Sequence, residues 1–117
     1  MPIEDDEQTA VRATLEALIE SLEAALAESA EAAKPVRLDQ DAVGRVSRID
    51  AIQQQQMVEA GRRSITSRIQ LARSALARLA ADEYGDCLAC GEAIDPARLA
   101  ARPESLHCVE CQNARER

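Results

Sequence analysis

Four cysteines fall into two pairs near the end of the sequence, Cys87-x2-Cys90 and, after a spacer of seventeen residues, Cys108-x2-Cys111. Each pair places two thiolates on one tight turn, within reach of a single ion. Two such turns provide the four sulfur ligands of tetrahedral zinc, at Zn–S distances of about 2.3 Å. Because four thiolates leave no position open for water or substrate, the spacing predicts one structural zinc ion and argues against catalysis by the metal.

The cysteines have other interpretations. Each pair could act as a redox dithiol, and His107 could replace the neighbouring Cys108 as a ligand. A disulfide framework is disfavoured because the segment from Met1 to Glu7 is acidic where a signal peptide would be basic. We therefore expect a cytoplasmic protein, in which the thiols stay reduced and bind metal.

Residues around the pairs indicate how the thiolates are positioned. Gly91 can adopt a positive φ, which suits a turn whose N–H groups point at sulfur. The second pair opens segment 109–117, which we expect to be a short C-terminal helix whose N-terminus stabilises thiolates. Between the pairs, Asp95 and Pro96 predict an N-cap followed by proline at the first helical position.

Few apolar side chains are available to hold this segment together. The candidates for a miniature core are Ile94, Leu99 and Leu106. The expected docking surface is the end of the preceding helix, with Leu76, Leu79 and Tyr84. So small a core would scarcely hold without metal.

Two long helices are expected in front of the cysteines. Residues 5–33 contain no Gly or Pro and repeat a narrow seam: Val11, Leu15, Leu18, Leu22, Ala25 and Ser29. A second helix is expected over residues 40–81. Its apolar contacts are expected from Val43, Val46, Ile49, Ile52, Met57, Ile65, Ile69, Leu76 and Leu79. The glutamines at 53–56 interrupt this stripe and predict a solvated or partner-facing patch.

The break between the helices lies at Pro35, which cannot continue the helical hydrogen bonds. Asp39 is then a candidate N-cap of the second helix, and Asp41 in the first turn complements its dipole. In an antiparallel hairpin closing near Pro35, the acidic start of the first helix would lie beside Arg62 to Arg68. These opposite charges either favour the antiparallel orientation of the two helices or are simply solvated on two surfaces.

These elements predict a mainly α fold: an antiparallel two-helix coiled-coil hairpin, then a small zinc finger with four cysteine ligands and a short C-terminal helix. We expect the hairpin over residues 1–82, with its tip at about 34–42, and the finger over 83–117. An apolar fraction of 46% with only 1% aromatic residues fits helices packed side by side. No stretch is apolar enough to span a membrane, and the formal charge of −7 disfavours direct binding of nucleic acid.

One string of residues carries a family resemblance. It runs Tyr84-Gly-Asp-Cys-x2-Cys-Gly91, then Ile94-x-Pro-Ala-Arg-Leu99, Arg102-Pro103 and Cys108-x2-Cys-Gln112. With the hairpin in front, it resembles the DksA/TraR family of zinc-finger regulators. The resemblance implies a non-enzymatic transcription regulator that acts on RNA polymerase without binding DNA. In that family the hairpin enters the secondary channel, and acidic residues at its tip approach the active site.

The tip and the alarmone contacts of that family are only partly matched. Characterised members carry Asp-x-x-Asp-x-Ala at the tip, whereas the candidates here are Asp39, Asp41 and Asp50, and none fits that pattern. In some members ppGpp binds between the protein and polymerase. The residue after the last cysteine is basic in characterised members and is Gln112 here, so Arg102 alone gives ppGpp weak support.

Two further functions compete with polymerase binding. A zinc-stabilised structural or adaptor protein could keep the fold and serve another protein partner, which the unmatched tip favours. A nucleic-acid-binding finger is less favoured because acids equal or exceed arginines in the segment after residue 82.

Overall fold

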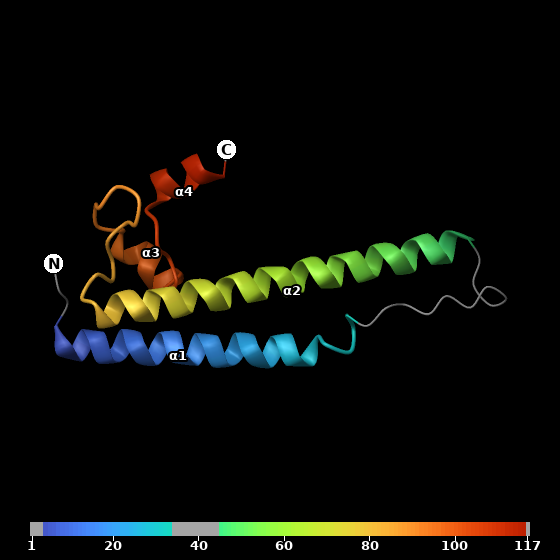
Figure 1. The fold of residues 1–117 in the computed structure, drawn as a ribbon, viewed down its shortest axis with the longest axis horizontal. Helices are drawn as coiled ribbons and strands as arrows, with labels where there is room; N and C mark the ends of the chain where they lie inside the picture. Colours follow the sequence, from blue (N-terminus) through green and yellow to red (C-terminus); the bar gives the residue numbers. More distant parts are fainter. Residues whose placement is uncertain (1–3, 34–44, 117) are drawn as a thin grey trace.

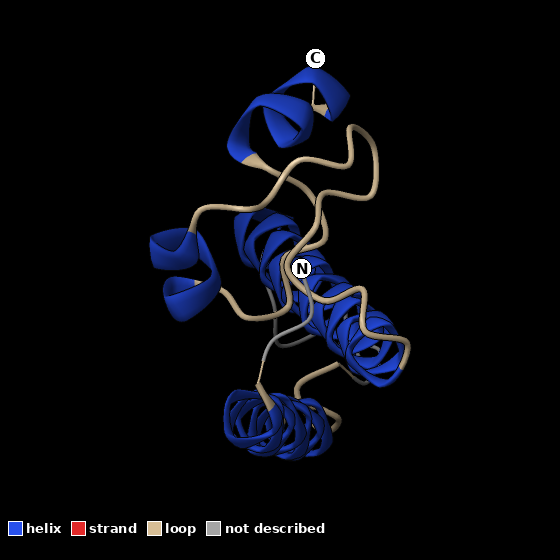
Figure 2. Ribbon diagram, turned by 90° about the vertical axis from the view of Figure 1, so that its left-hand side faces the viewer, coloured by secondary structure: helices blue, strands red, loops and turns tan. Residues whose placement is uncertain are grey.

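A computed structural model describes residues 4–33 and 45–116, with side chains in the second range from residue 48 onward. Four helices follow one another: α1 (Asp5–Glu28), α2 (Arg45–Ala80), α3 (Pro96–Ala101) and α4 (Val109–Arg115). α1 and α2 run side by side as an antiparallel pair, and the segment with α3 and α4 lies at one end of this pair (Figure 1). Viewed along the helices, α2 lies between α1 and this segment (Figure 2). The predicted mainly α hairpin with a small appended module is confirmed.

The seam of α1 is the one that the sequence predicts. Leu15 is fully buried and Leu22 nearly so, while Val11, Leu18, Ala25 and Ser29 are half-buried. Three acidic residues in the first turn complement the helix dipole. The helix ends at Glu28, earlier than the expected Ala33, and residues 29–33 form turns.

α2 packs on α1 through small and branched side chains. Its buried residues are Ile69, Ala72, Ala75 and Leu79. Ala72 and Ala75 form one core cluster with Leu15 of α1, and their small side chains let the helices approach closely. The part of the predicted helix from 40 to 44 lies outside the described residues. No helix of the described ranges is long and apolar enough to cross a membrane.

The apolar contacts predicted for the first half of α2 are partly wrong. Ile49, Ile52 and Met57 are 50%, 45% and 69% exposed. At this end of α2, polar side chains form hydrogen bonds with the end of α1 and the turns that follow it. Gln55 Nε2 donates to the Ala33 carbonyl, and Arg62 donates to a carbonyl group at the end of α1. Because α1 ends at Glu28, its seam does not extend along these turns.

The predicted pairing register is also wrong. Gln8, near the start of α1, donates to Asp82 just after α2, at 2.8 Å, so the acidic start lies beside the end of α2 and not beside Arg62 to Arg68. The physical reason is the long connection: residues 29–44 separate the two helices, whereas the prediction assumed a tight turn at Pro35. Among the described residues, Arg73 of α2 forms a complementary ion pair with Glu23 of α1 at 2.7 Å. Both side chains are largely exposed, so the pair contributes only about 0–1 kcal/mol.

Arg62 closes the C-terminal end of α1. Its Nη1 donates to the Leu26 carbonyl at 2.6 Å and to Ser29 Oγ at 2.5 Å. The last turn of α1 contains no basic residue, so its free carbonyl groups and the negative end of its dipole lack a local cation. Arg62 supplies that cation from the neighbouring helix.

We expect Arg62→Met to lower the free energy of unfolding by about 1–2 kcal/mol, because a charged donor to the helix end is lost. The exposed neighbour Arg63 provides the control: Arg63→Met should change stability by less than about 0.5 kcal/mol. Thermal and urea unfolding followed by circular dichroism would measure both. Equal stability of the two variants would contradict this role for Arg62.

Candidate metal centre

The first cysteine pair lies on a short loop directly after α2. The chain leaves the helix through Asp82, whose φ of 59° is left-handed, and through Gly85, whose φ is 95°. An isolated antiparallel bridge between Asp86 and Ala93 then closes the loop around Cys87 and Cys90. Such a narrow loop holds the two thiols of the pair close to each other.

Gly91 completes this loop as predicted. Its φ is 78°, a conformation that favours glycine, and its N–H donates to the Cys87 carbonyl at 3.0 Å. The Cys87 N–H in turn donates to the Glu92 carbonyl at 2.7 Å. Backbone hydrogen bonds therefore fix the turn at both ends.

The second pair lies at the start of the predicted C-terminal helix. Cys108 is the N-cap of α4, and Cys111 lies within its first turn. The Leu88 N–H donates to the Leu106 carbonyl at 2.8 Å, which joins the first cysteine loop to the segment that leads into the second pair. The helix N-terminus thus faces the metal centre, where it favours negatively charged sulfur.

All four Sγ atoms lie within 4.8 Å of one another, and those of Cys90 and Cys108 are 3.9 Å apart. A zinc tetrahedron with bonds of about 2.3 Å has sulfur–sulfur edges of about 3.8 Å. Within the described ranges, this is the cluster of side chains that could hold a metal ion. The donor set and its dimensions fit a single structural zinc.

The thiols need a cation to become four thiolates together. Hydrogen bonds from the backbone of Cys108, and then of Cys90, lower the pKa of the Cys87 thiol to about 5. The neighbouring sulfurs, first that of Cys108, raise the pKa of Cys111 to about 12. When bound, a zinc ion supplies the positive charge that lets all four sulfurs ligate as thiolates.

His107 does not belong to the sulfur cluster. Its side chain is buried, and its backbone carbonyl accepts a hydrogen bond of 3.1 Å from Arg98 Nε. The group that could hold a metal consists of the four cysteines. The alternative in which His107 replaces a cysteine therefore has no support in this geometry.

The predicted miniature core docks on the hairpin. Ile94 is buried, Leu99 and Leu106 are half-buried, and Leu106 packs with Tyr84 and Leu76 against the α1–α2 core cluster. The end of α2 lies between the finger and α1, which covers its other side (Figure 2). The predicted N-cap of α3 is also present: Asp95 Oδ1 accepts from the Ala97 N–H at 2.9 Å.

An ion pair between Arg68 and Glu104 was missed by the sequence analysis. Arg68 Nε donates to Glu104 Oε2 at 3.0 Å, and Glu104 is only 2% exposed. The sequence shows Glu104 as one acid among many, and no local pattern marks it as buried. Its partner is distant in the chain, so only the tertiary fold identifies it.

The predicted tip residues are far from the metal centre or outside the described ranges. Asp39 and Asp41 lie outside the described residues. Asp50 is exposed near the start of α2, at the end of the hairpin away from the cysteines (Figure 1).

Comparisons with known proteins address both parts of the chain. The family described as "Prokaryotic dksA/traR C4-type zinc finger" matches residues 82–117. Residues 82–117 are a DksA/TraR-type C4 zinc finger. The resemblance drawn from the sequence is confirmed, and so is the prediction of one structural zinc ion.

A solved structure has a fold similar to that of the whole chain. The chain is similar to "Structure of transcription factor DksA2 from Pseudomonas aeruginosa", with a TM-score of 0.74 and 23% identity over 97% of this chain and 85% of that chain. A comparison with curated proteins gave no match. The solved structure supports the fold of hairpin and finger together.

We expect one zinc ion per chain, measured by atomic absorption on freshly purified protein. Cys108→Ser removes an anionic ligand and should release the zinc and unfold the finger, while the helical signal of the hairpin largely remains. Val109→Ser, at an exposed neighbouring position, is the matched control and should keep the metal. Full zinc content in Cys108→Ser would refute this ligand assignment.

Zinc removal should also loosen the end of α2. Because Leu106 and Tyr84 of the finger pack, like Leu76 of α2, against the core cluster of the hairpin, chelation should lower the melting temperature and speed amide exchange over residues 76–81. Amides near Leu22, which lie farther along the hairpin, provide the internal reference. Unchanged protection at 76–81 would mean that hairpin and finger are independent.

Proposed function

We propose that the chain is a transcription regulator that binds RNA polymerase through its hairpin, without direct contact to DNA. The observation that carries the proposal is the combination of a DksA/TraR-type finger with a hairpin whose fold is similar to that of a transcription factor over 97% of the chain. The resemblance implies entry of the hairpin into the secondary channel of polymerase. The formal charge of −7 favours a protein partner over a nucleic acid.

In this proposal the metal centre has a structural role. Cys87, Cys90, Cys108 and Cys111 would hold zinc as thiolates and fix the finger on the base of the hairpin, about the end where α1 begins and α2 ends. The opposite end, with Asp39, Asp41 and Asp50, would contact polymerase. The two ends have different tasks, so their variants should have different effects.

A response to ppGpp has weak support. Arg102 and Gln112, at the two positions where the family resemblance places alarmone contacts, line one cavity of about 400 Å³. Arg98 lines the same cavity, together with Glu104 and Glu116, whose charges oppose those of a polyphosphate. The acids offset the two arginines, so the cavity gives ppGpp binding only weak support.

Retention on immobilised core polymerase, followed by transcription in vitro, tests the proposal. The zinc-loaded chain should bind, and replacing residues 36–42 by a short Gly-Ser linker should abolish binding while zinc content stays at one ion per chain. Failure of the intact chain to bind would remove the proposal.

A second candidate is an adaptor with another protein partner. The acidic candidates at the tip do not match the family pattern, and Ile49, Ile52 and Met57 are exposed on the same half of α2. Polymerase binding at micromolar concentration would dispose of this alternative.

The acidic candidates at the tip can be tested by charge-removing variants. If Asp39 is only an N-cap, Asp39→Asn should preserve helicity and regulation, because asparagine also accepts the backbone hydrogen bond. If its charge acts near the polymerase active site, the variant should keep helicity and zinc but lose its effect on transcription. We expect loss of regulation in Asp39→Asn, Asp41→Asn or both.

The structural alternative for Asp41 is a dipole contribution of about 0.3–1 kcal/mol, which unfolding measurements would detect. Retained regulation by the double variant would restrict both acids to structural roles. The search would then move to Asp50, Arg48 and the glutamines at 53–56.

A further inference from the structure

Glu104 is a buried acid at the junction of finger and hairpin. It is 2% exposed, and it lies on the segment between α3 and the second cysteine pair. Its Oε2 accepts from Arg68 Nε at 3.0 Å, while Arg102 Nε is 3.9 Å away. Its Oε1 is buried and finds no hydrogen-bond partner in the described part of the chain. Arg68 is therefore the nearer of the two arginines that face this carboxylate.

Arg68 reaches Glu104 from the middle of α2. It lies four residues before Ala72 and one before Ile69, next to the buried face of the hairpin, and its side chain is 37% exposed. Within the described ranges, it makes the long-range ion pair between the hairpin and the finger. The apolar part of this junction is small and rests on Leu106 and Tyr84.

We propose that the Arg68–Glu104 pair is a latch that fixes the finger on α2 and makes the affinity for zinc depend on the hairpin. A buried carboxylate that loses its cation is strongly destabilising, so the docked position of the finger requires Arg68. Without Arg68, the finger must either bury an unpaired charge or leave the helix.

The latch connects to the metal through the backbone around Glu104. The Leu106 carbonyl accepts from Leu88, inside the first cysteine loop, and Cys108 follows two residues later. Tyr84 Oη also donates to the Pro103 carbonyl at 2.9 Å, which holds the same segment. A finger whose segment 103–108 is ordered by the metal presents Glu104 to Arg68, and an unfolded finger does not. By linkage, free energy gained at the latch appears as tighter zinc binding.

The test measures zinc affinity by competition with a chelator in full-length variants. Arg68→Met should weaken zinc binding about tenfold or more, because the finger loses its docked state and Glu104 loses its partner. Arg73→Met is the matched control, since Arg73 is an exposed arginine of the same helix whose pair with Glu23 does not involve the finger. That variant should remain within about twofold of the unmodified chain.

A double-variant cycle separates the latch from two independent effects. Glu104→Gln keeps the shape of the side chain and removes its charge. In Arg68→Met with Glu104→Gln, the loss of zinc affinity should be smaller than the product of the two single losses, because the pair is broken only once. At saturating zinc, Arg68→Met should also speed amide exchange over residues 69–75, whereas Arg73→Met should not.

Three results would overturn the latch. They are a zinc affinity of Arg68→Met equal to that of Arg73→Met, single losses that multiply in the double variant, and unchanged exchange over 69–75. If Arg68→Met fails to fold, Glu104→Gln is measured alone, for its zinc affinity and for amide exchange over residues 69–75. Values equal to those of the unmodified chain would then overturn the latch. The latch concerns zinc binding by this chain alone, so a failure to bind polymerase would not contradict it.

Discussion

The anchoring of the finger by four sulfurs is the constraint on which the base of the molecule depends. The segment after α2 has few apolar side chains, of which Ile94 is buried and Leu99 and Leu106 only half-buried. Such a core cannot offset the conformational entropy of ordering the loops. Zinc bound by both cysteine pairs would join the two loops and keep Leu106 packed against the cluster of Leu15, Ala72 and Ala75.

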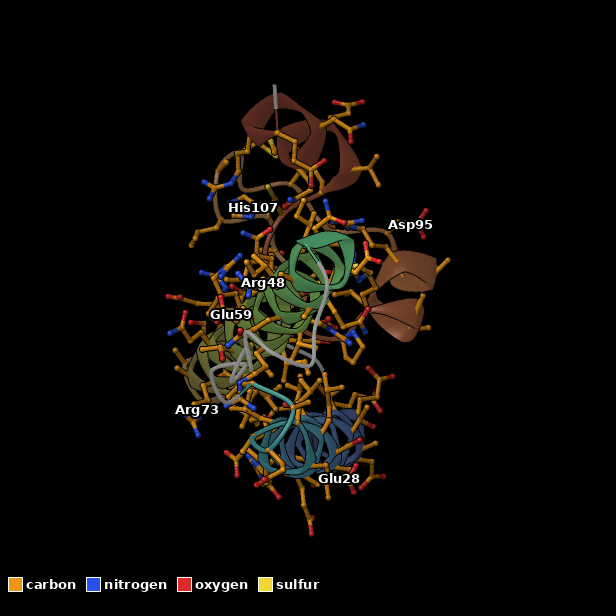
Figure 3. The ribbon with its side chains drawn as sticks, turned by 90° about the vertical axis from the view of Figure 1, so that its right-hand side faces the viewer. Glu28, Arg48, Glu59, Arg73, Asp95 and His107 are labelled. Atoms are coloured by element: carbon orange, nitrogen blue, oxygen red, sulfur yellow. The ribbon has the colours of Figure 1, made fainter. Side chains whose placement is uncertain are left out.

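The hairpin is stabilised by apolar packing and by polar contacts between α1 and α2. A narrow seam centred on Leu15 and Leu22 meets small residues of α2, so the helices pack closely with little aromatic area. Polar contacts then set the register: Gln8 with Asp82 at one end, and Arg62 with the last carbonyl groups of α1. The finger lies at the end of the hairpin where α1 begins and α2 ends (Figure 1). In a view along the hairpin, the charged side chains of Arg48, Glu59 and Arg73 lie on the same side of α2 (Figure 3).

Sequence patterns over a few residues predicted the features that depend on neighbouring residues. They did not predict contacts between residues far apart in the chain. The two cysteine pairs, the positive φ of Gly91, the cap at Asp95 and the seam of α1 all follow from residues a few positions apart. The register failed because it depends on where the connection between the helices begins and ends. The burial of Glu104 escaped because its partner Arg68 is thirty-six residues away, and no periodicity relates the two. The exposure of Met57 reflects the early end of α1, which helix propensity alone does not determine.

The proposed binding of a zinc-anchored hairpin to RNA polymerase can be measured by titration with core polymerase, performed with the zinc-loaded chain and repeated after chelation. We expect saturable binding that weakens when zinc is removed, because the base of the hairpin loosens. No saturable binding at micromolar concentration, or an affinity unaffected by chelation, would contradict it.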